Sequence, residues 1–380
     1  MKKYIIIAFA AIAASVACSK VETPEVQKEI NFEVANALQT KATGSLYNNG
    51  AFGTYAWFTA NPGAGSDHAP FMVNETVDKV GGVWKTSVNT FYWPKTGSVE
   101  FISYSPVSGT NGTADSNPAV TQNTITYTSL TAGDVDYMYA DKATASKNVN
   151  MVTDGVDSGY SGVPTIFRHA LAKLSFKIKA NFVKYTDPTT NTTTTWDVTV
   201  KSAKISGFYT TGDCTLNLDM DSEGVTMPWK KPAGEVWTNL SGTTAEQELV
   251  NATTYPSGIL LPDPSDPNNN PIDLEATAST YVIPQNLETA KQKIQLDVHI
   301  TTHLSNGLVI EEDFTPTIDI KDISSLSAWK MNQNIVYTIN IKPTAIADPN
   351  NNDNPNDVII TFDPAVADWT NVDAAATIQL

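Results

Sequence analysis

Cysteine is nearly absent from this chain of 380 residues, which contains only Cys18 and Cys214. Two cysteines allow one disulfide bond at most, and none if Cys18 is modified, so side-chain packing must stabilise the fold. Cys214 alternates with Leu216 and Leu218, a pattern typical of a buried strand residue and not of a reactive thiol. The scarcity of cysteine therefore excludes a disulfide scaffold.

Positive charge is also scarce, because 24 lysines and arginines stand against 40 acidic residues and leave a net charge of -16. Such a charge disfavours nucleic acid and anionic lipid headgroups as partners and fits an extracellular protein that stays in solution. Charged residues make up only 17% of the chain, against 41% hydrophobic residues. Asn, Thr, Gly and Pro are frequent, which favours short strands joined by turns around one core or two.

The short motifs of common enzymes are missing: the chain has no G-x-S-x-G elbow, P-loop, C-x-x-C pair or dinucleotide fingerprint. His299 and His303 are four residues apart, but they lie in QLDVHITTHL, which alternates like a strand and lacks the HExxH glutamate. We therefore predict a protein that is not an enzyme and has no cofactor or metal. A secreted hydrolase, the enzymatic alternative, needs acids clustered in a cleft.

Only one long apolar run is present, at residues 4–14, and it is too short to span a bilayer as a mature helix. Lys2 and Lys3 precede this run and small residues follow it, which describes a secretory signal peptide over residues 1–17. The next residue, Cys18, resembles the lipidated first residue of a lipoprotein. The alternative is an ordinary secreted protein that is cut nearby.

From residue 51 onward, strand patterns separated by turn clusters fill the chain. Clear examples are AFGTYAWFTA, SVEFISYSP, HALAKLSFKIKANFV and KIQLDVHITTHL. Strands at this spacing predict an all-β fold of sandwiches. We expect few short helices, with one around residues 323–329.

The segment 220–248 is weak in strand pattern and rich in Gly, Pro and Trp, which predicts a domain boundary near residue 222. An N-terminal sandwich would then cover residues 42–222, and a C-terminal sandwich residues 223–380. Two Asp/Asn/Pro-rich loops, at 263–271 and 348–357, offer oxygen ligands for calcium. Neither loop has the glycine and terminal glutamate of an EF-hand, which favours solvated turns.

The stretch KEINFEVANALQTKATGS, residues 28–45, begins with a strand. Ile30, Phe32 and Val34 alternate with polar residues, which is the period of a strand with one buried face. Lys41 follows in a small, polar run that has the character of an exposed protease site. The first good strand of the chain thus precedes a candidate cleavage point.

Several stretches together resemble the Bacteroidales fimbrillins, the type V pilin superfamily. They are the lipoprotein signal with its first strand, FRHALAKLSFKIKA, YVIPQN, WKMNQNIVYTINI and VIITFDPAVADWT. The resemblance covers nearly the whole chain. It implies two tandem transthyretin-like β-sandwich domains and a structural role in a surface fibre.

The resemblance also implies a mechanism in which a lipidated precursor reaches the outer membrane and a protease removes its first strand. Residues 18–41 would be the lipidated propeptide, with Cys18 the lipid attachment point and the cut between Lys41 and Ala42. A C-terminal strand of the next subunit would then fill the exposed groove. The displaced strand would comprise Ile30, Phe32, Val34 and Leu38, and the donor strand Val358, Ile360, Phe362, Ile378 and Leu380.

One feature departs from the family, whose best-known members are cut after arginine. The single arginine of this chain, Arg168, lies inside FRHALAKL next to a strong strand, where a cut would destroy a domain. Either the protease accepts Lys41 or no cut occurs, and the uncut strand is then a permanent part of the fold.

These expectations leave three roles open. The leading one is a stalk pilin that polymerises with copies of itself on the cell surface, with anchor and tip subunits and a maturation protease as partners. An anchor or tip subunit of the same fimbria is the near alternative. A non-polymerising surface lipoprotein that binds host glycans or proteins is the third.

Overall fold

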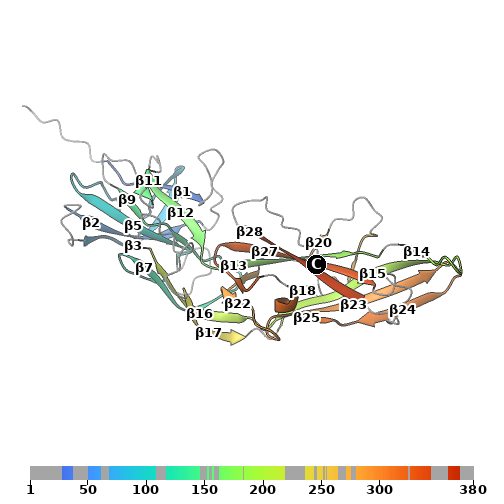
Figure 1. Ribbon diagram of the computed structural model, residues 1–380. Helices are drawn as coiled ribbons and strands as arrows, with labels where there is room; N and C mark the ends of the chain where they lie inside the picture. The colour runs from blue at the N-terminus through green and yellow to red at the C-terminus, as the bar shows by residue number, and fades with distance from the viewer. Residues whose placement is uncertain are drawn as a thin grey trace, which may run out of the picture.

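A computed structural model gives the fold of this chain. It describes residues 28–36, 50–60, 68–107, 117–145, 152–153, 156–157, 162–182, 184–218, 236–243, 246–250, 253, 255–263, 271–274, 280–323, 326–343 and 358–368. The described chain is almost entirely β-structure, which confirms the all-β prediction. The molecule is elongated, with one group of sheets at each end (Figure 1).

A ten-stranded sheet forms the N-terminal end of the molecule. Its strands are, in spatial order, β11 (Val156–Asp157), β10 (Val152–Thr153), β9 (Ala143–Ala145), β5 (Ser98–Ser105), β2 (Phe52–Thr59), β3 (His68–Val80), β4 (Val83–Thr86), β1 (Phe32–Asn36), β12 (Val163–His169) and β8 (Met138–Ala140). Because β8 pairs with both β12 and β5, the sheet closes on itself between these strands. Closure leaves β1 as one wall of a barrel.

Inside this barrel lies a cluster that we call the barrel core. Its buried members include Ile30, Phe32, Val34, Phe52, Val77, Val99, Phe101 and Phe167. A four-stranded sheet packs against the outside of β5, and its order is β17 (Trp237–Thr243), β16 (Tyr209–Asn217), β7 (Thr124–Thr131) and β6 (Ala119–Val120). Ile102 and Tyr104 of β5 face this second sheet, so both faces of β5 are buried.

Two sheets face each other in the C-terminal half. One contains β20 (Ile272–Asp273), β13 (Ala172–Ala180), β27 (Gln333–Pro343) and β28 (Val358–Asp368) in this order, with β21 (Thr280–Val282) paired to β13. The other contains β14 (Tyr185–Thr186), β15 (Thr193–Ser206), β23 (Lys293–Leu304) and β24 (Val309–Phe314), with β18 (Gln247–Val250), β19 (Ile259–Leu260) and β25 (Thr317–Asp319) paired along it. Strict alternation along β13 directs every second side chain into the space between the sheets, which we call the sandwich core.

The smallest sheet pairs β22 (Gln285–Asn286) with β26 (Ala328–Trp329), and the helix among the described residues is α1 (Ile320–Ile323). The helix expected around residues 323–329 meets α1 at Ile323, whereas the described residues 326–329 are not helical. Trp329 is buried in the sandwich core and pairs with Gln285, so tertiary packing overrides the local pattern.

The domain boundary predicted near residue 222 falls in 219–235, outside the described residues. Strands from both sides of that segment share the sandwich core, since β13 pairs with β27 and β15 pairs with β23. The change from the barrel core to the sandwich core occurs between β12 and β13, at Ala170 and Leu171. The strands of the sandwich core therefore begin after residue 171, although β16 and β17, later in the chain, belong to the four-stranded sheet that packs against β5.

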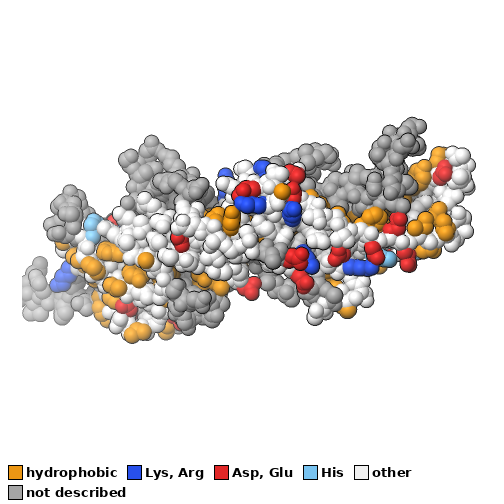
Figure 2. All heavy atoms as spheres, turned by 90° about the horizontal axis from the view of Figure 1, so that it is seen from below, with side chains coloured by type: hydrophobic (Ala, Val, Ile, Leu, Met, Phe, Trp, Pro, Cys, Tyr) orange, Lys and Arg blue, Asp and Glu red, His pale blue; other side chains and the backbone are white. Residues whose placement is uncertain are grey.

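Hydrophobic side chains are visible on the surface at both ends of the molecule (Figure 2). The large exposed ones include Val73 and Val88 near strands β3 and β4, and Leu308 and Val309 at the turn between β23 and β24. Within the described part of the chain, no helix has the length and apolarity needed to cross a membrane.

Candidate assembly site at strand β1

Strand β1 fills the space between β12 and β4 in the closed sheet. It runs parallel to β12, with Phe32 opposite Val163 and Asn36 opposite Phe167. On its other side, Phe32 pairs with Trp84 of β4. The pairing on the β12 side is long and the pairing on the β4 side is short, so β12 provides most of the backbone ladder.

The alternation read from the sequence is confirmed in the barrel core. Ile30, Phe32 and Val34 are 2%, 4% and 8% exposed. The Phe32 ring meets Phe52 and Phe101 edge to face, at centroid distances of 5.7 and 5.8 Å. Aromatic pairs in this geometry are stabilising beyond their buried area, so Phe32 is the main anchor of β1.

Hydrogen bonds to the segment after β4 hold the start of the strand. The Ile30 N–H donates to the Phe91 carbonyl at 2.9 Å, and the Trp93 N–H donates to the Lys28 carbonyl at 3.0 Å. These bonds lie just before β1 and extend its pairing toward the N-terminus. The segment from residue 28 is therefore held along both edges, as an inserted strand must be.

Gly162 permits the close approach of β1 to β12. A Cβ atom at Gly162 would lie 3.0 Å from both the Asn31 carbonyl oxygen and the Phe32 carbonyl carbon. The next residue, Val163, donates its N–H to the same Asn31 carbonyl at 2.8 Å. Sequence reasoning missed Gly162, although a glycine at the start of a strand signals a close backbone approach.

Several residues of the predicted maturation machinery lie outside the described residues. They are Cys18, Leu38, Lys41, Ala42, Ile378 and Leu380. The lipid attachment, the cleavage point and the final donor residues therefore stay predictions.

The other predicted donor residues lie in β28, which pairs antiparallel with β27 over its whole length. Val358, Ile360 and Phe362 are opposite Pro343, Ile341 and Ile339. In the order of its sheet β28 is the last strand, so one edge of it has no partner among the described strands. An edge strand of this kind is a template for pairing with another chain.

The single arginine is inaccessible. Arg168 lies in β12, where its Nε and Nη2 donate to the two carboxylate oxygens of Asp141, both at 2.6 Å. The side chains of this pair are 2% and 1% exposed. A protease cannot reach the Arg168 backbone in the folded chain, because β12 is paired on both sides.

The residues considered for other chemistry lie in separate places. His299 and His303 lie on strand β23, as predicted, and bond to different carboxylates, Asp313 at 2.8 Å and Asp197 at 2.9 Å. Cys214 is buried in β16, and burial raises the pKa of its thiol, which disfavours the reactive thiolate. Across the described residues, no group of three or more His, Cys, Asp or Glu side chains has the arrangement of a metal site.

Comparison with known proteins agrees with this architecture. A sequence profile described as Fimbrillin-like matches residues 40–369. The chain belongs to the fimbrillin-like family. No curated protein sequence matches it.

Among solved structures, a fimbrial protein from Bacteroides vulgatus ATCC 8482 is similar with a TM-score of 0.56 and 19% identity, covering 90% of this chain and 100% of that chain. A protein proposed to act in cell adhesion, from Bacteroides uniformis ATCC 8492, gives 0.42 and 19%, covering 92% and 100%. The fimbrial anchor protein Mfa2 from Porphyromonas gingivalis gives 0.25 and 8%, covering 90% and 98%. The first of these shows a shared fold.

Proposed function

We propose that this protein is a structural subunit of a surface fimbria that polymerises by strand exchange, most specifically a stalk pilin. Membership of the fimbrillin-like family supports a fimbrial subunit at the cell surface with a structural role. The observation that carries the finer proposal is strand β1, which forms one side of the barrel core and is connected to the next strand, β2, through residues 37–51. A cut in that segment separates β1 from the fold it completes.

The precursor in this proposal is exported and lipidated at Cys18, and it reaches the outer membrane. A maturation protease that accepts lysine then cuts between Lys41 and Ala42. Burial of Arg168 supports this choice, because the single arginine is inaccessible to an arginine-specific protease. The protease specificity is thus part of the proposal.

Loss of β1 creates a strong demand for a replacement strand. Three buried side chains, Ile30, Phe32 and Val34, stabilise the barrel core by roughly 1.5–3 kcal/mol each, or about 5–9 kcal/mol together. This is comparable to the whole stability of a typical domain. A donor strand restores both the apolar contacts and the backbone bonds to β12 and β4.

The donor in this proposal is the C-terminal region of another copy, with Val358, Ile360 and Phe362 followed by Ile378 and Leu380. Alternation in this region provides one apolar face that matches the face of β1. To donate residues 358–368, the chain must release β28 from β27, so exchange includes the opening of one edge ladder. Head-to-tail addition of this kind does not close and yields a filament.

A second role is favoured by one specific observation, which is that β1 and β28 are both paired within the chain. An uncut anchor subunit, or a surface lipoprotein that binds host glycans or proteins, would keep this arrangement permanently. A tip subunit would be cut but would not donate its C-terminus.

The decisive experiment is to isolate the protein from the surface of its native cell and to determine its N-terminus by mass spectrometry. We expect a start at Ala42 in material of high molecular mass. If every surface-derived molecule starts at a lipidated Cys18, the stalk role is wrong and an anchor or monomeric binding lipoprotein remains.

A matched pair of recombinant chains tests the exchange itself. A chain that begins at residue 19 keeps β1 and should stay monomeric, whereas a chain that begins at Ala42 should form oligomers by size-exclusion chromatography with light scattering. Deletion of residues 358–380 from the shorter chain should return it to a monomer. Oligomers that persist after this deletion would contradict the assigned donor.

A further inference from the structure

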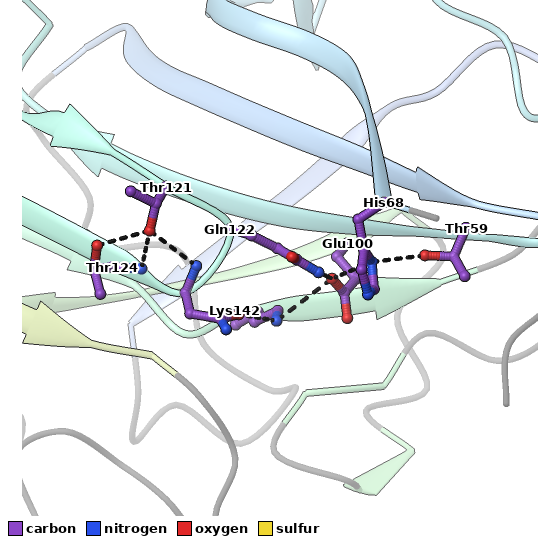
Figure 3. A network of polar contacts seen from close by, with 8 residues as sticks. Thr59, His68, Glu100, Thr121, Gln122, Thr124 and Lys142 are labelled. Carbon is purple, nitrogen blue, oxygen red and sulfur yellow. Dashed lines mark hydrogen bonds and ion pairs between the residues drawn. The ribbon is translucent and has the colours of Figure 1, made fainter. Parts of the chain in front are cut away.

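A half-buried polar cluster lies where the ten-stranded and four-stranded sheets meet, well apart in sequence from β1. Glu100 comes from β5, Asn123 from the turn before β7, and Lys142 from the link between β8 and β9. Gln122 and His68 complete the cluster, and Figure 3 shows Lys142, Gln122 and His68 gathered around Glu100. None of these residues takes part in the proposed strand exchange.

The contacts bring an amine, an amide and a carboxylate together. The Lys142 Nζ donates to the Asn123 Oδ1 at 2.8 Å and lies 3.4 Å from the Glu100 Oε2. The Gln122 Nε2 donates to the same Glu100 oxygen at 2.7 Å, and the His68 Nδ1 lies 3.5 Å from it. These contacts hold the Glu100 carboxylate in place beside the Lys142 amine.

We propose that Lys142 and Asn123 form an intramolecular isopeptide bond, with Glu100 as the group that transfers the proton. This inference does not rest on the proposed function, because it concerns covalent chemistry within one folded chain. The three functional groups are those that such a bond requires: a nucleophilic amine, an amide that can lose ammonia, and an adjacent carboxylate as acid and base.

The step balances without any co-reactant. The Lys142 ammonium gives one proton to the Glu100 carboxylate, and the neutral Nζ attacks the Asn123 Cγ to form a new C–N bond. Glu100 returns the proton to the amide nitrogen as the original C–N bond breaks, and the nitrogen leaves as ammonia, which takes the remaining proton of the attacking amine as ammonium. The protein loses one ammonia and one positive charge.

The geometry is close to what the reaction needs. Because a C=O bond is about 1.2 Å long, a contact of 2.8 Å to the Asn123 Oδ1 keeps the Lys142 Nζ within about 4 Å of the Cγ. A reactive approach is about 3–3.5 Å, so a shift of roughly 1 Å is sufficient. The Lys142 and Glu100 side chains are only 11% and 17% exposed, which keeps most water away from the reacting groups.

The backbone around the acceptor is fixed independently of the reaction. The Asn123 carbonyl accepts the Leu218 N–H at 2.7 Å, and the Asn123 N–H donates to the Thr121 Oγ1 at 3.4 Å. The bond would join the turn before β7 in the four-stranded sheet to the link between β8 and β9 in the ten-stranded sheet. It would act as a covalent cross-link between two sheets of a fold in which the described cysteine, Cys214, is unpaired.

The test is the mass of the whole folded protein, purified from its native cell and as a recombinant chain that begins at residue 19. We expect a denatured mass lower than the sequence mass by one ammonia, and a branched chymotryptic peptide that contains both Asn123 and Lys142, because chymotrypsin cleaves between them at Tyr127 and Tyr137 whereas trypsin has no site there. The full sequence mass in both preparations would overturn the proposal.

Three variants separate this bond from other losses of ammonia, such as succinimide formation at the Asn-Gly pairs that begin at Asn49, Asn111 and Asn306. K142R keeps the positive charge but lacks the Nζ amine. The peptide that contains Asn123 should therefore have its unmodified mass. N123D should form the same bond with loss of water in place of ammonia, and E100Q should slow the loss at least tenfold while the fold, followed by circular dichroism, is kept.

Each other outcome contradicts a defined part of the assignment. If K142R still loses ammonia and gives no branched peptide, the ammonia comes from a reaction of asparagine with its own backbone and not from a bond to lysine. A branched peptide that persists in N123A would transfer the acceptor role to Gln122, and an unchanged rate in E100Q would remove the role of Glu100.

Discussion

In the barrel core, aromatic rings meet edge to face around a strand of five residues, whereas the sandwich core is mainly aliphatic and lies between strands of nine to fourteen residues. The short strand β1 is joined to β2 through residues 37–51. The long strands β13, β15, β23 and β27 belong to the interior of the chain sequence. The two halves therefore differ in how much of their core one cut can remove.

This difference indicates that one end of a single elongated subunit can lose stability while the other end keeps it. Loss of β1 exposes Phe52, Phe101 and Phe167 in the barrel core. It leaves the sandwich core intact, because the two clusters share no buried residue. Local opening of this kind is expected where one structural unit has its own set of contacts.

Removal of residues 1–41 is the change with the largest expected effect. It should lower the free energy of unfolding of the barrel half by about 5–9 kcal/mol, because three buried apolar side chains are lost. Hydrogen exchange, measured at a concentration low enough to keep the shortened chain monomeric, should then accelerate in β2 and β12 and stay unchanged in β13 and β27. Equal acceleration in both halves would mean that the two cores unfold as one unit.

The substitution Asp141→Asn should come next, since it removes the Asp141 carboxylate from its ion pair with the buried Arg168 guanidinium. Breaking a buried ion pair costs about 3–5 kcal/mol, and urea unfolding followed by fluorescence measures this loss. The matched control is the double variant Asp141→Leu and Arg168→Met, which should be much less destabilised. A double variant as unstable as the single one would argue for a role in packing and not in charge pairing.

Two equivalent side-chain truncations, one in each core, compare the two halves with a smaller loss of stability. Ile30→Val in β1 and Ile339→Val in β27 each remove one buried methylene group, and each should cost about 0.5–1.5 kcal/mol. Only Ile30→Val should also speed the replacement of β1 by an added peptide of residues 28–40 that carries a fluorescent label. The peptide should exchange at the parental rate in Ile339→Val.

The smallest expected effect is a pH dependence on the surface of the sandwich. Lys201 and His299 bond to Asp313 and hold the pKa of its carboxyl below the usual value. A lowered pKa stabilises the folded state above the ordinary aspartate range, and this contribution is lost as the pH falls through the folded pKa. Asp313→Asn should therefore reduce the slope of acid unfolding below pH ~4. An identical slope in the variant would contradict the assignment.

The sequence predicts strand β1 and its buried face well, because alternation of Ile30, Phe32 and Val34 is a local signal. It does not predict that β1 lies parallel to β12, since the two strands are more than a hundred residues apart and no periodicity records their pairing. For the same reason, Gly162 and Trp84 were not identified as neighbours of the site.

The division of the chain is a clearer case of this limit. A weak pattern at 220–248 predicts a boundary near residue 222, which lies outside the described residues and stays a prediction. Strands β13 and β15, before that segment, pair with β27 and β23, after it. The change from the barrel core to the sandwich core at Ala170 and Leu171 lies within a continuous strand pattern, FRHALAKL, which gives no local sign of it. Long-range pairing, and not composition, determines where the cores separate.

The long strands of the sandwich have a mechanical consequence for a fibre. Strands β15 and β23 run along the long axis of the molecule and are paired over almost their whole length (Figure 1). Tension along that axis pulls the two strands past each other, so their hydrogen bonds are loaded in shear and must break together. Strands that lie across the axis would instead open one bond at a time, which makes the observed orientation the stiffer and tougher one under load.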